Sequence, residues 1–202
     1  AIGRECRAHG VAVVLGPGVN IKRSPLCGRN FEYYSEDPLL AGKLAAGFIR
    51  GAEGEGVGTS LKHFAVNNQE TLRMSVSAEV DERALHELYL RPFEIAVKEG
   101  APSTVMCSYN RINGVYASEN RMLLTRILRE QWGFDGLVMS DWGAVYRRPA
   151  GVAAGLDLEM PSSGGVTDRE IVRAVRAGRL DEAALDALCA RVLRLALAHA
   201  PQ

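Results

Sequence analysis

Short apolar runs alternate along the chain with longer stretches in which apolar residues recur at helical spacing. The apolar runs predict strands over 10–19, 57–64, 103–109, 136–140 and 156–160. The amphipathic stretches predict helices over 38–53, 81–99, 118–132, 167–177 and 181–199. Strands that alternate with helices in this way are typical of βα units around a parallel sheet. A long loop over 20–37, rich in arginine, asparagine and aromatic residues, separates the first strand from its helix and indicates a functional segment.

The number of predicted elements decides the fold class. Five strands are too few for a closed barrel of eight, and an open parallel sheet needs its edges covered. The chain also begins as if in the middle of a helix, at Ala1 to Glu5. We therefore predict an α/β fold in which residues 1–202 form a single, partial (β/α) barrel of TIM type, with about five βα units visible and the first units missing. Exposed edges of such a barrel predict self-association.

Composition and charge exclude several classes of protein. The formal net charge is zero, which gives no electrostatic basis for binding nucleic acid or an anionic membrane surface. No apolar run approaches the roughly 18 residues of a membrane-spanning helix. The four histidines share no H-x-H or HExxH spacing, and the GxGxxG, Walker-type and G-x-S-x-G motifs are absent from the sequence. The sequence therefore predicts no metal site, no cofactor and no serine hydrolase.

The four cysteines are scattered and have no C-x-x-C spacing, which argues against a zinc site or a redox pair. This spacing indicates small core residues and is compatible with a reducing compartment. Arginine outnumbers lysine, as is typical of proteins from GC-rich bacterial genomes. The chain lacks a recognisable signal peptide, and the expectation is cytoplasmic rather than secreted.

Polar residues cluster just after each predicted strand. They are Asn20, Arg23, Arg29 and Glu32 after the first strand, Lys62, His63, Asn67, Glu70 and Arg73 after the second, Tyr109 and Asn110 after the third, and Asp141 and Trp142 after the fourth. The carboxyl ends of barrel strands meet on one face, which is where ligands bind. We therefore expect these residues to form one pocket.

Asp141 is the strongest candidate for chemistry. The apolar run 136–140 needs no ionisable group at its end, yet it leads directly into Asp141 and Trp142. One alternative is that Asp141 caps a following helix, which is common for aspartate at a βα turn. Trp142 is compatible with a core position or with an aromatic platform for the apolar face of a sugar ring.

Other residues of this cluster have structural alternatives. Arg29 is equally compatible with bracing its loop through Glu32, Glu36 or Asp37. Lys62 and His63 are compatible with a surface pair, but two adjacent donors in a pocket with arginine and aspartate favour binding of hydroxyl groups. A barrel aldolase or lyase with Lys62 as a Schiff-base amine is a further alternative, because nearby cationic groups depress a lysine pKa.

Taken together, four segments closely resemble the N-terminal barrel domain of glycoside hydrolase family 3, of the β-glucosidase and β-xylosidase type. They are GPGVNIKRSPLCGRNFEYYSEDP (16–38), SLKHFAVNNQETLR (60–73), VMCSYNRINGVYAS (105–118) and GFDGLVMSDWGA (133–144), and LDLEMP (156–161) matches the end of the barrel. The resemblance implies a retaining β-glycosidase, β-glucosidase-like, that acts at non-reducing ends of β-linked oligosaccharides or on aryl and alkyl glycosides.

The resemblance also implies a role for each matching residue. Asp141 is the nucleophile that forms a covalent glycosyl-enzyme. The positions that hold the sugar hydroxyls or form the wall of the subsite are Arg29, Lys62, His63, Arg73, Met106, Tyr109 and Trp142. Arg73 is expected to hydrogen-bond Asp141 as well, Tyr109 to support the nucleophile, Met106 to form an apolar wall and Trp142 an aromatic one.

The sequence departs from the family pattern in three respects. The segment after Lys62-His63-Phe64 is AVNNQE rather than a PGHG-like loop, which favours the glucosidase branch and makes His63 a binding residue. The upstream segment with a sugar-binding aspartate is missing, and so is the second domain that supplies the general acid/base in that branch. Glu70, Glu159 and Glu32 are the local carboxyl groups that could replace it, and none matches the family's acid position. The alternative is a catalytically inactive fragment with residual sugar binding or a structural role.

Overall fold

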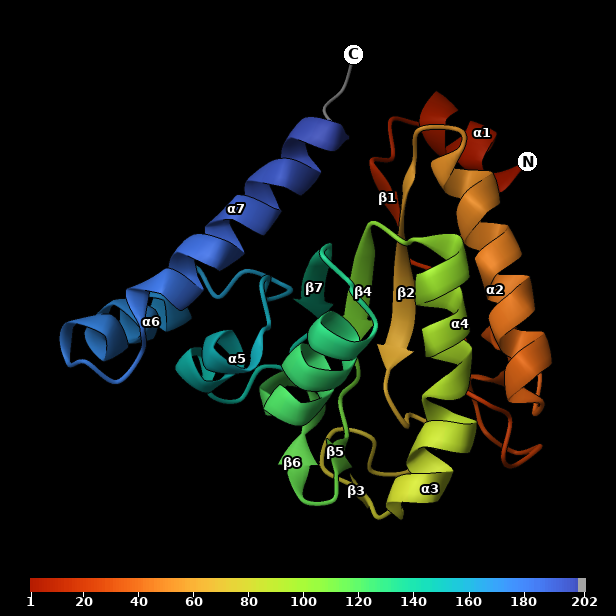
Figure 1. Ribbon diagram of the computed structural model, residues 1–202, viewed down its shortest axis with the longest axis horizontal. Helices are drawn as coiled ribbons and strands as arrows, with labels where there is room; N and C mark the ends of the chain where they lie inside the picture. Colours follow the sequence, from red (N-terminus) through yellow and green to blue (C-terminus); the bar gives the residue numbers. More distant parts are fainter. Residues whose placement is uncertain (200–202) are drawn as a thin grey trace.

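Four parallel strands form the main sheet, in the order β1-β2-β4-β7 (Figure 1). The computed structural model describes residues 1–199, so the domain expected over 1–202 extends beyond the described residues. The strands are β1 (Val13–Val14), β2 (Gly58–Phe64), β4 (Thr104–Cys107) and β7 (Leu137–Ser140). In the register of the central strands, Val105 pairs with Leu61 on one side and with Val138 on the other. The α/β class predicted from the sequence is confirmed.

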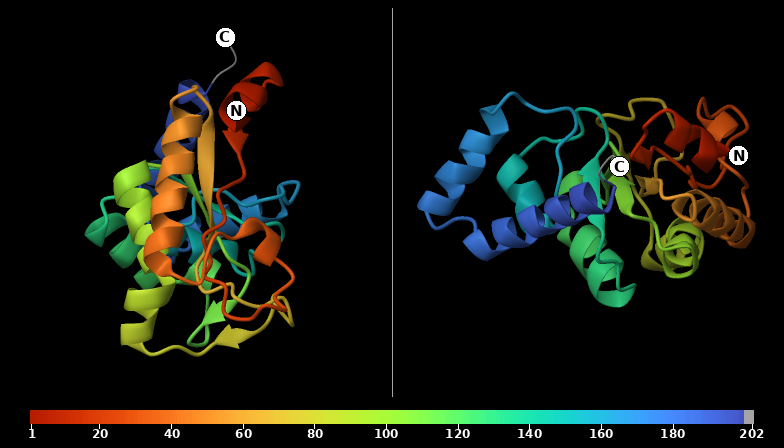
Figure 2. Two further views of the ribbon diagram at one scale, coloured as in Figure 1. Left: turned by 90° about the vertical axis from the view of Figure 1, so that its right-hand side faces the viewer. Right: turned by 90° about the horizontal axis from the view of Figure 1, so that it is seen from above.

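Helices follow the strands in βα order. The long α2 (Pro38–Glu53) and α4 (Arg91–Gly100) pack side by side on one face of the sheet (Figure 1). They approach closely at Gly42, where a Cβ atom would lie 2.8 Å from Cβ of Ile95. Further helices are α1 (Ile2–Ala8), the short α3 (Glu82–Ala84), α5 (Arg148–Ala154), α6 (Val166–Arg176) and α7 (Glu182–Ala198). Figure 2 shows α1 and the last turn of α7 together at the end where the strands begin.

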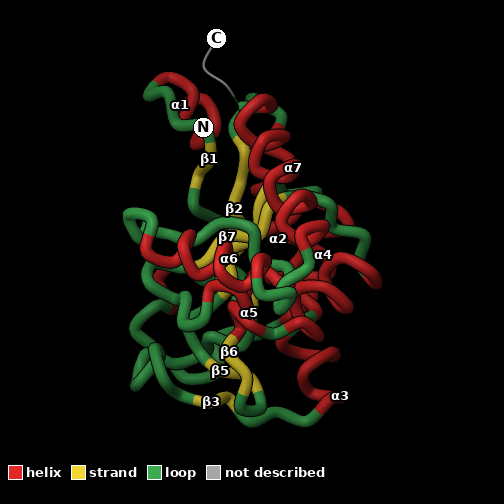
Figure 3. The backbone as a smooth tube through the Cα atoms, turned by 90° about the vertical axis from the view of Figure 1, so that its left-hand side faces the viewer, coloured by secondary structure: helices red, strands yellow, loops and turns green. Residues whose placement is uncertain are grey.

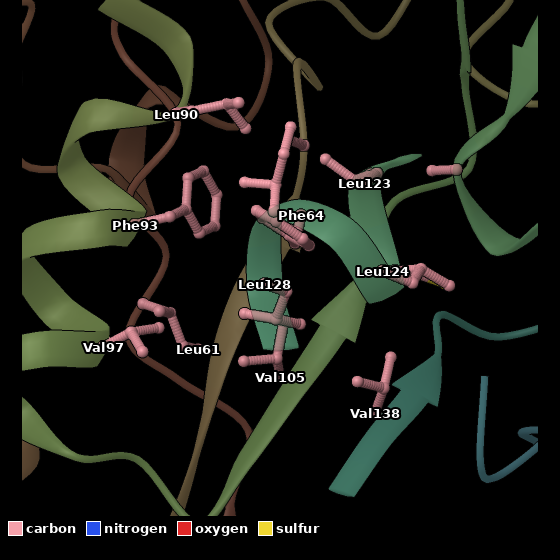
Figure 4. Packing of buried hydrophobic residues seen from close by; sticks show 14 of the residues in the cluster. Leu61, Phe64, Leu90, Phe93, Val97, Val105, Leu123, Leu124, Leu128 and Val138 are labelled. Atoms are coloured by element: carbon pink, nitrogen blue, oxygen red, sulfur yellow. The ribbon is translucent and has the colours of Figure 1, made fainter. Parts of the chain in front are cut away.

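Alternation along the strands divides the core between the two faces of the sheet. On one face, β2 and β4 pack against α4 and the π-helical stretch η4 (Met122–Gln131), with Phe64 and Phe93 at a ring-centroid distance of 5.2 Å. Figure 4 shows this cluster, whose fully buried side chains each stabilise the fold by about 1.5–3 kcal/mol. On the opposite face, a smaller cluster of Met106, Leu137 and Met139 packs against Val192 and Leu195 of α7.

Aspartates at the predicted helix starts act as caps. The carboxylate of Asp37 accepts hydrogen bonds from the backbone N–H groups of Leu39 and Leu40, and Pro38 occupies the first helical position of α2. Asp181 caps α7 in the same way, as predicted. Gly178 follows α6 with a φ of +65°, a conformation that favours glycine after a helix end.

The helix predicted over 81–99 is divided into three parts. They are α3 (Glu82–Ala84), the π-helical turn η2 (Leu85–Tyr89) and α4. Pro92 at the start of α4 has no N–H for the carbonyl of Leu88, so the α-helical ladder cannot continue through this point. The backbone N–H of Leu90 instead donates to the carbonyl of Leu85, five residues earlier.

Two predicted strands are shorter than expected. Within 10–19 only Val13–Val14 is a strand, because Pro17 interrupts the ladder, and Gly18 then forms isolated bridges to Tyr33 and Lys62. The prediction of a strand over 156–160 is wrong. Only Leu158 forms a bridge, with Met139 of β7, although this segment does extend the sheet beyond β7. Association of copies through the sheet edges stays a prediction.

The sequence pattern missed a small second sheet and helix α5. The sheet consists of β3 (Ser77–Ala78), β5 (Arg111–Ile112) and β6 (Val115–Tyr116). Each of its strands has only two residues, which is too short for a detectable alternation of apolar and polar positions. Figure 3 shows this sheet at the end of the molecule where loops follow the main strands.

The cysteines differ in environment. Cys107 is buried on β4, and burial raises the pKa of its thiol to about 12. Cys189 is exposed on α7, so the expectation that the cysteines are core residues is wrong there. Among residues 1–199, no helix has both the length and the apolar character to cross a bilayer.

Candidate active site

The carboxyl ends of β2 and β7 and the loop after β1 bring three predicted site residues together. Oδ2 of Asp141 lies 3.7 Å from Nε2 of His63 and 3.9 Å from Nη1 of Arg29. Arg29 lies immediately before a single 3₁₀ turn, η1 (Asn30–Glu32), in the long loop. The side chains of all three residues are largely buried, so their charges interact in a medium that screens them less than water does.

A local irregularity in β2 brings Lys62 and His63 to the site. The pairing of β2 with β4 shifts register between Leu61 and Phe64. In a regular strand, successive side chains point to opposite faces, whereas a bulge redirects them. Asn20 fixes the irregular segment, because its side-chain amide accepts from the backbone N–H of His63 and donates to the His63 carbonyl.

Asp141 has one oxygen held and one oxygen free. Oδ1 accepts a hydrogen bond of 2.8 Å from the backbone N–H of Trp142. Oδ2 is buried and has no hydrogen-bond partner among the described residues. The alternative in which Asp141 caps a helix is wrong, since the next helix, α5, begins seven positions later at Arg148 and follows Arg147. A carboxylate fixed by one oxygen and open at the other has the geometry of a nucleophile or a ligand-binding group.

Glu32 joins Arg29 and Lys62 into one ionic cluster. Its Oε1 lies 2.5 Å from Nε of Arg29, and its Oε2 lies 2.9 Å from Nζ of Lys62. Burial opposes ionisation of Glu32, but the hydrogen bonds from Lys62 and Arg29 outweigh it and lower the pKa of the carboxyl group. An ionised Glu32 has no proton to donate, so it does not serve as a general acid. The Lys62 ammonium in this ion pair also argues against a Schiff-base amine.

His63 is neutral, and its neighbours determine its tautomer. Burial, followed by the charges of Arg29, Lys62 and Arg73, lowers the pKa of His63 well below its usual value. Nδ1 of His63 lies 3.1 Å from the hydroxyl of Tyr33, and this hydroxyl has no other partner among the described residues. Burial raises the pKa of Tyr33, so its hydroxyl stays protonated and is able to donate a hydrogen bond to Nδ1. The Asp141 carboxylate, 3.7 Å from Nε2, favours a proton on that nitrogen, and we assign the imidazole to the Nε2–H tautomer.

The Tyr33→Phe substitution is expected to remove the preference of His63 for the Nε2–H tautomer. Without the hydroxyl donor, Nδ1 of His63 is free to carry the proton, and the imidazole becomes a mixture of tautomers. Nitrogen-15 NMR of the histidine rings measures this directly, with Nε2–H dominant in the unsubstituted chain and mixed signals in the variant. Tyr34→Phe is the matched control, since the neighbouring Tyr34 packs against the core. Unchanged His63 signals in Tyr33→Phe would contradict the assignment.

The depressed pKa of His63 predicts a pH-dependent stability. Below an unfolded pKa of about 6.5, the unfolded chain binds a proton that the folded chain excludes. His63 therefore lowers the free energy of unfolding as pH falls below that value, by at most about 1.4 kcal/mol per pH unit. Urea unfolding between pH 7 and 5 is expected to show a smaller loss in His63→Gln than in the unsubstituted chain. Equal losses would show that His63 titrates normally.

Arg73 and Tyr109 lie beside each other, but Arg73 is not paired with Asp141. The guanidinium carbon of Arg73 lies 4.8 Å from the centroid of the Tyr109 ring, and its Nη1 lies 2.7 Å from Oε2 of Glu70. No contact between Arg73 and Asp141 is present among the described residues, so the expected hydrogen bond is wrong in this structure. Burial raises the pKa of Tyr109 to about 12, and the negative charge of Asp141 adds to this.

The two expected walls differ in accessibility. The Trp142 side chain is exposed over 45% of its surface, which makes its ring available to a ligand. Met106 is 2% exposed and packs with Leu137 and Met139 on the face of the sheet that α7 covers. The structure therefore places Met106 in the core beneath this region rather than on an open surface.

The other carboxyl groups have partners of their own. Glu70 pairs with Arg73, and Glu159 accepts a hydrogen bond from the Thr167 hydroxyl. Within residues 1–199, no three His, Cys, Asp or Glu side chains are grouped closely enough to hold a metal ion. The sequence pattern missed Tyr33, because nothing in the spacing of residues 33 and 63 indicates that their side chains meet.

Comparisons with known proteins agree with this geometry. Residues 1–195 match the family described as "Glycosyl hydrolase family 3 N terminal domain". The chain is 57% identical over 195 residues to "Thermostable beta-glucosidase B" of Acetivibrio thermocellus and 57% identical over 195 residues to "Exo-alpha-(1->6)-L-arabinopyranosidase" of Bifidobacterium longum. The structure of β-glucosidase 3B from Thermotoga neapolitana in complex with α-D-glucose superimposes with a TM-score of 0.95 at 48% identity.

These similarities cover nearly the whole chain but only part of each relative. Each of the two sequence matches includes 96% of this chain and 26% of the relative. The match to the Thermotoga structure includes 98% of this chain and 29% of that one. The chain therefore spans about a quarter of the length of the relatives that it matches.

Proposed function

The chain belongs to glycosyl hydrolase family 3, and we propose that it carries the nucleophile and sugar-binding part of a retaining glycosidase. The observation that supports this most is the state of Asp141. One carboxylate oxygen is held by the Trp142 N–H, and the other is buried near His63 and Arg29 with no hydrogen-bond partner within residues 1–199. In the proposed reaction, this free oxygen forms a bond to the anomeric carbon.

The proposed reaction has two displacements. Oδ2 of Asp141 attacks the anomeric carbon, and the bond from that carbon to the leaving oxygen breaks, which gives a glycosyl ester. Water then attacks the same carbon and releases a proton to the solvent, while the ester bond breaks and the Asp141 carboxylate is restored. The sugar product has the original anomeric configuration. The first step needs a proton on the leaving oxygen unless the leaving group is a stable anion. Glu32 does not supply this proton, because its hydrogen bonds with Lys62 and Arg29 outweigh burial and keep it ionised.

The groups around Asp141 suit a neutral, polyhydroxylated ring. Lys62 and Arg29 offer donors, Glu32 offers acceptors, and the Nε2–H of His63 offers a further donor. A sugar hydroxyl both donates and accepts, so it can join this cluster without leaving a buried charge unpaired. The exposed ring of Trp142 adds an aromatic surface for the C–H face of the sugar. Roles for Arg73 and Tyr109 as further hydroxyl ligands belong to the same proposal.

The names of the two sequence relatives define a substrate class. One is named a β-glucosidase and the other an exo-α-(1→6)-L-arabinopyranosidase, at equal identity. The D/L and α/β labels differ, yet both glycosides can present an equatorial leaving oxygen on a pyranose ring. We propose that Asp141 accepts this shared arrangement and that groups around the C4 and C5 substituents decide between the two sugars.

The test uses activated glycosides that need no acid. The 2,4-dinitrophenyl β-D-glucopyranoside and α-L-arabinopyranoside are mixed with the chain, and release of dinitrophenolate is followed at stopped-flow resolution. The expected result is a burst of up to one equivalent per chain, followed by slow turnover with retained configuration by proton NMR. Inverted product would contradict the mechanism. Absence of a burst with both compounds, with sugar binding retained, would favour the inactive sugar-binding alternative.

A further inference from the structure

A cavity lies beside the loops at the carboxyl ends of the strands. Its volume is about 450 Å³, within the range of small-molecule sites. Its walls come from the loop 66–69, the β3 region 76–80, Arg23 and Ser24 of the long loop, Tyr89 of η2 and Asn110 after β4. Figure 3 shows β3, which belongs to one of these walls, beside β5 and β6 at one end of the molecule. Asp141, Arg29, Lys62 and His63 do not line it.

Three asparagines in this cavity have unused hydrogen-bonding atoms. Asn67 is 2% exposed, and neither its Nδ2 nor its Oδ1 has a partner among the described residues. Asn110 is 1% exposed and uses Nδ2 for the carbonyls of Ala65 and Arg111, while its Oδ1 is unpartnered. Asn68 donates from Nδ2 to the carbonyl of Ile21 and likewise leaves Oδ1 unused. Buried polar atoms without partners are costly, so this concentration in one cavity indicates a ligand.

The pattern of unused atoms identifies the chemistry of that ligand. Three amide oxygens need donors, and the Nδ2 of Asn67 needs an acceptor. Rotating the Asn67 amide exchanges its two ends but leaves both requirements in place. A bare cation satisfies the oxygens and repels the amide N–H groups, whereas hydroxyl groups donate and accept. Arg23 and Glu79 bring opposite charges to the wall, and the Tyr89 ring adds an aromatic surface.

We propose that this cavity is a second binding site, for a neutral polyhydroxylated ligand of the saccharide class, and that the amides of Asn67, Asn68 and Asn110 hold its hydroxyl groups. Binding at this site does not require Asp141 to act as a nucleophile, so the proposal can be tested independently of the proposed hydrolysis. Its position on the same edge of the sheet would allow the chain to hold a sugar next to the one being cleaved or a separate molecule.

NMR titration of the chain with D-glucose and with methyl β-D-glucopyranoside tests the proposal. The signals to follow are the side-chain amide of Asn67 and the backbone amides of 66–69 and 76–80. The Arg29→Ala substitution is expected to weaken sugar binding near Asp141, and it leaves the cavity wall unchanged. The variant therefore distinguishes binding in the cavity from binding near Asp141. We expect saturable shifts at the cavity in both backgrounds. Calcium chloride serves as the cation control and is expected to produce no saturable shift there.

Variants of the wall complete the test. Asn67→Leu removes both amide ends at similar size and is expected to weaken binding about tenfold or more, since its hydrogen bonds are lost. Ala78→Leu is expected to block the cavity sterically, and thermal melts confirm that each variant is folded. The proposal is overturned if sugar shifts occur only around Asp141 and Trp142, if calcium alone produces saturable shifts at the cavity, or if both folded variants bind as the unsubstituted chain does.

Discussion

Replacing Asp141 with asparagine is expected to abolish the dinitrophenolate burst, with a loss of rate on the order of 10⁴-fold or more. Asparagine keeps the Oδ1 hydrogen bond from the Trp142 N–H, so the segment after β7 stays in place. The neutral amide has no anionic oxygen to attack the anomeric carbon. Stopped-flow release from 2,4-dinitrophenyl β-D-glucopyranoside measures the loss.

A matched substitution and a rescue experiment separate the nucleophile from a general effect of charge. Asp135→Asn is the control, because the Asp135 side chain is 93% exposed before β7 and pairs with Arg194 only at 4.0 Å. It is expected to leave the burst unchanged. In Asp141→Ala, added azide is expected to occupy the space of the carboxylate and to give an α-glycosyl azide. A normal burst in Asp141→Asn, or azide product of β configuration, would show that Asp141 is not the nucleophile.

The second large effect is expected on stability, at Asp157. This carboxylate is fully buried and accepts from Arg129 at 2.7 Å and from Arg191 at 2.8 Å, which link η4 and α7. Its Oδ2 also accepts from the backbone N–H of Val138 in the middle of β7. Asp157→Asn removes the charge that these two cations share. Removing one partner from a buried ionic cluster costs about 3–5 kcal/mol, which is a large part of a typical domain's stability.

Urea unfolding measures this cost. The free energy of unfolding of Asp157→Asn is expected to fall by about 3–5 kcal/mol, with the midpoint shifted to lower urea. Asp135→Asn again serves as the control, and its effect is expected within about 1 kcal/mol, because its ion pair is on the surface. A loss below about 1 kcal/mol in Asp157→Asn would mean that water or another group compensates the two arginines. Burial already lowers the pKa of Arg129, which shows how little solvent reaches this cluster.

The same cluster explains part of the geometry at Asp141. The segment after Asp157 extends the sheet, and the backbone N–H of Ser140 donates to the carbonyl of Leu158. The Ser140 hydroxyl accepts from the N–H of Met160, and the N–H of Gly143 donates to the Met160 carbonyl. The carboxylate therefore follows a strand that is held along its whole length. Asp157 and its arginines stabilise this support.

Sequence pattern alone located the strands that position the site. Gly58–Phe64 and Leu137–Ser140 lie within the predicted strands 57–64 and 136–140. Leu137–Met139 is a continuous apolar segment, as is typical of a buried parallel strand. The change from apolar residues to Asp141 and Trp142 was therefore visible in the sequence. Arg29 and His63 were expected near Asp141 because the ends of parallel strands meet on one side of a sheet, and the structure brings them together.

Other features depend on contacts that no local pattern encodes. The hydrogen bond between Tyr33 and His63, which bears on the tautomer, joins the long loop after β1 to strand β2, 30 residues away in sequence. Arg73 forms its ion pair with Glu70 rather than with Asp141, because the Glu70 carboxylate lies only three residues away on the same turn of the loop. Burial of Met106 follows from α7, which packs over the second face of the sheet. In each case, tertiary packing decides between partners of similar chemistry.

Covalent trapping tests the central claim most directly. A 2-deoxy-2-fluoro-β-D-glucoside with a dinitrophenyl leaving group needs no proton donor, and its fluorine slows hydrolysis of the glycosyl-enzyme so that the intermediate accumulates. Intact mass spectrometry followed by peptide mapping then locates the label. We expect one fluoroglucosyl group per chain, attached to Asp141, and no label in Asp141→Asn. A label on another carboxylate such as Glu32, Glu70 or Glu159, or no label in a folded chain that binds glucose, would contradict it.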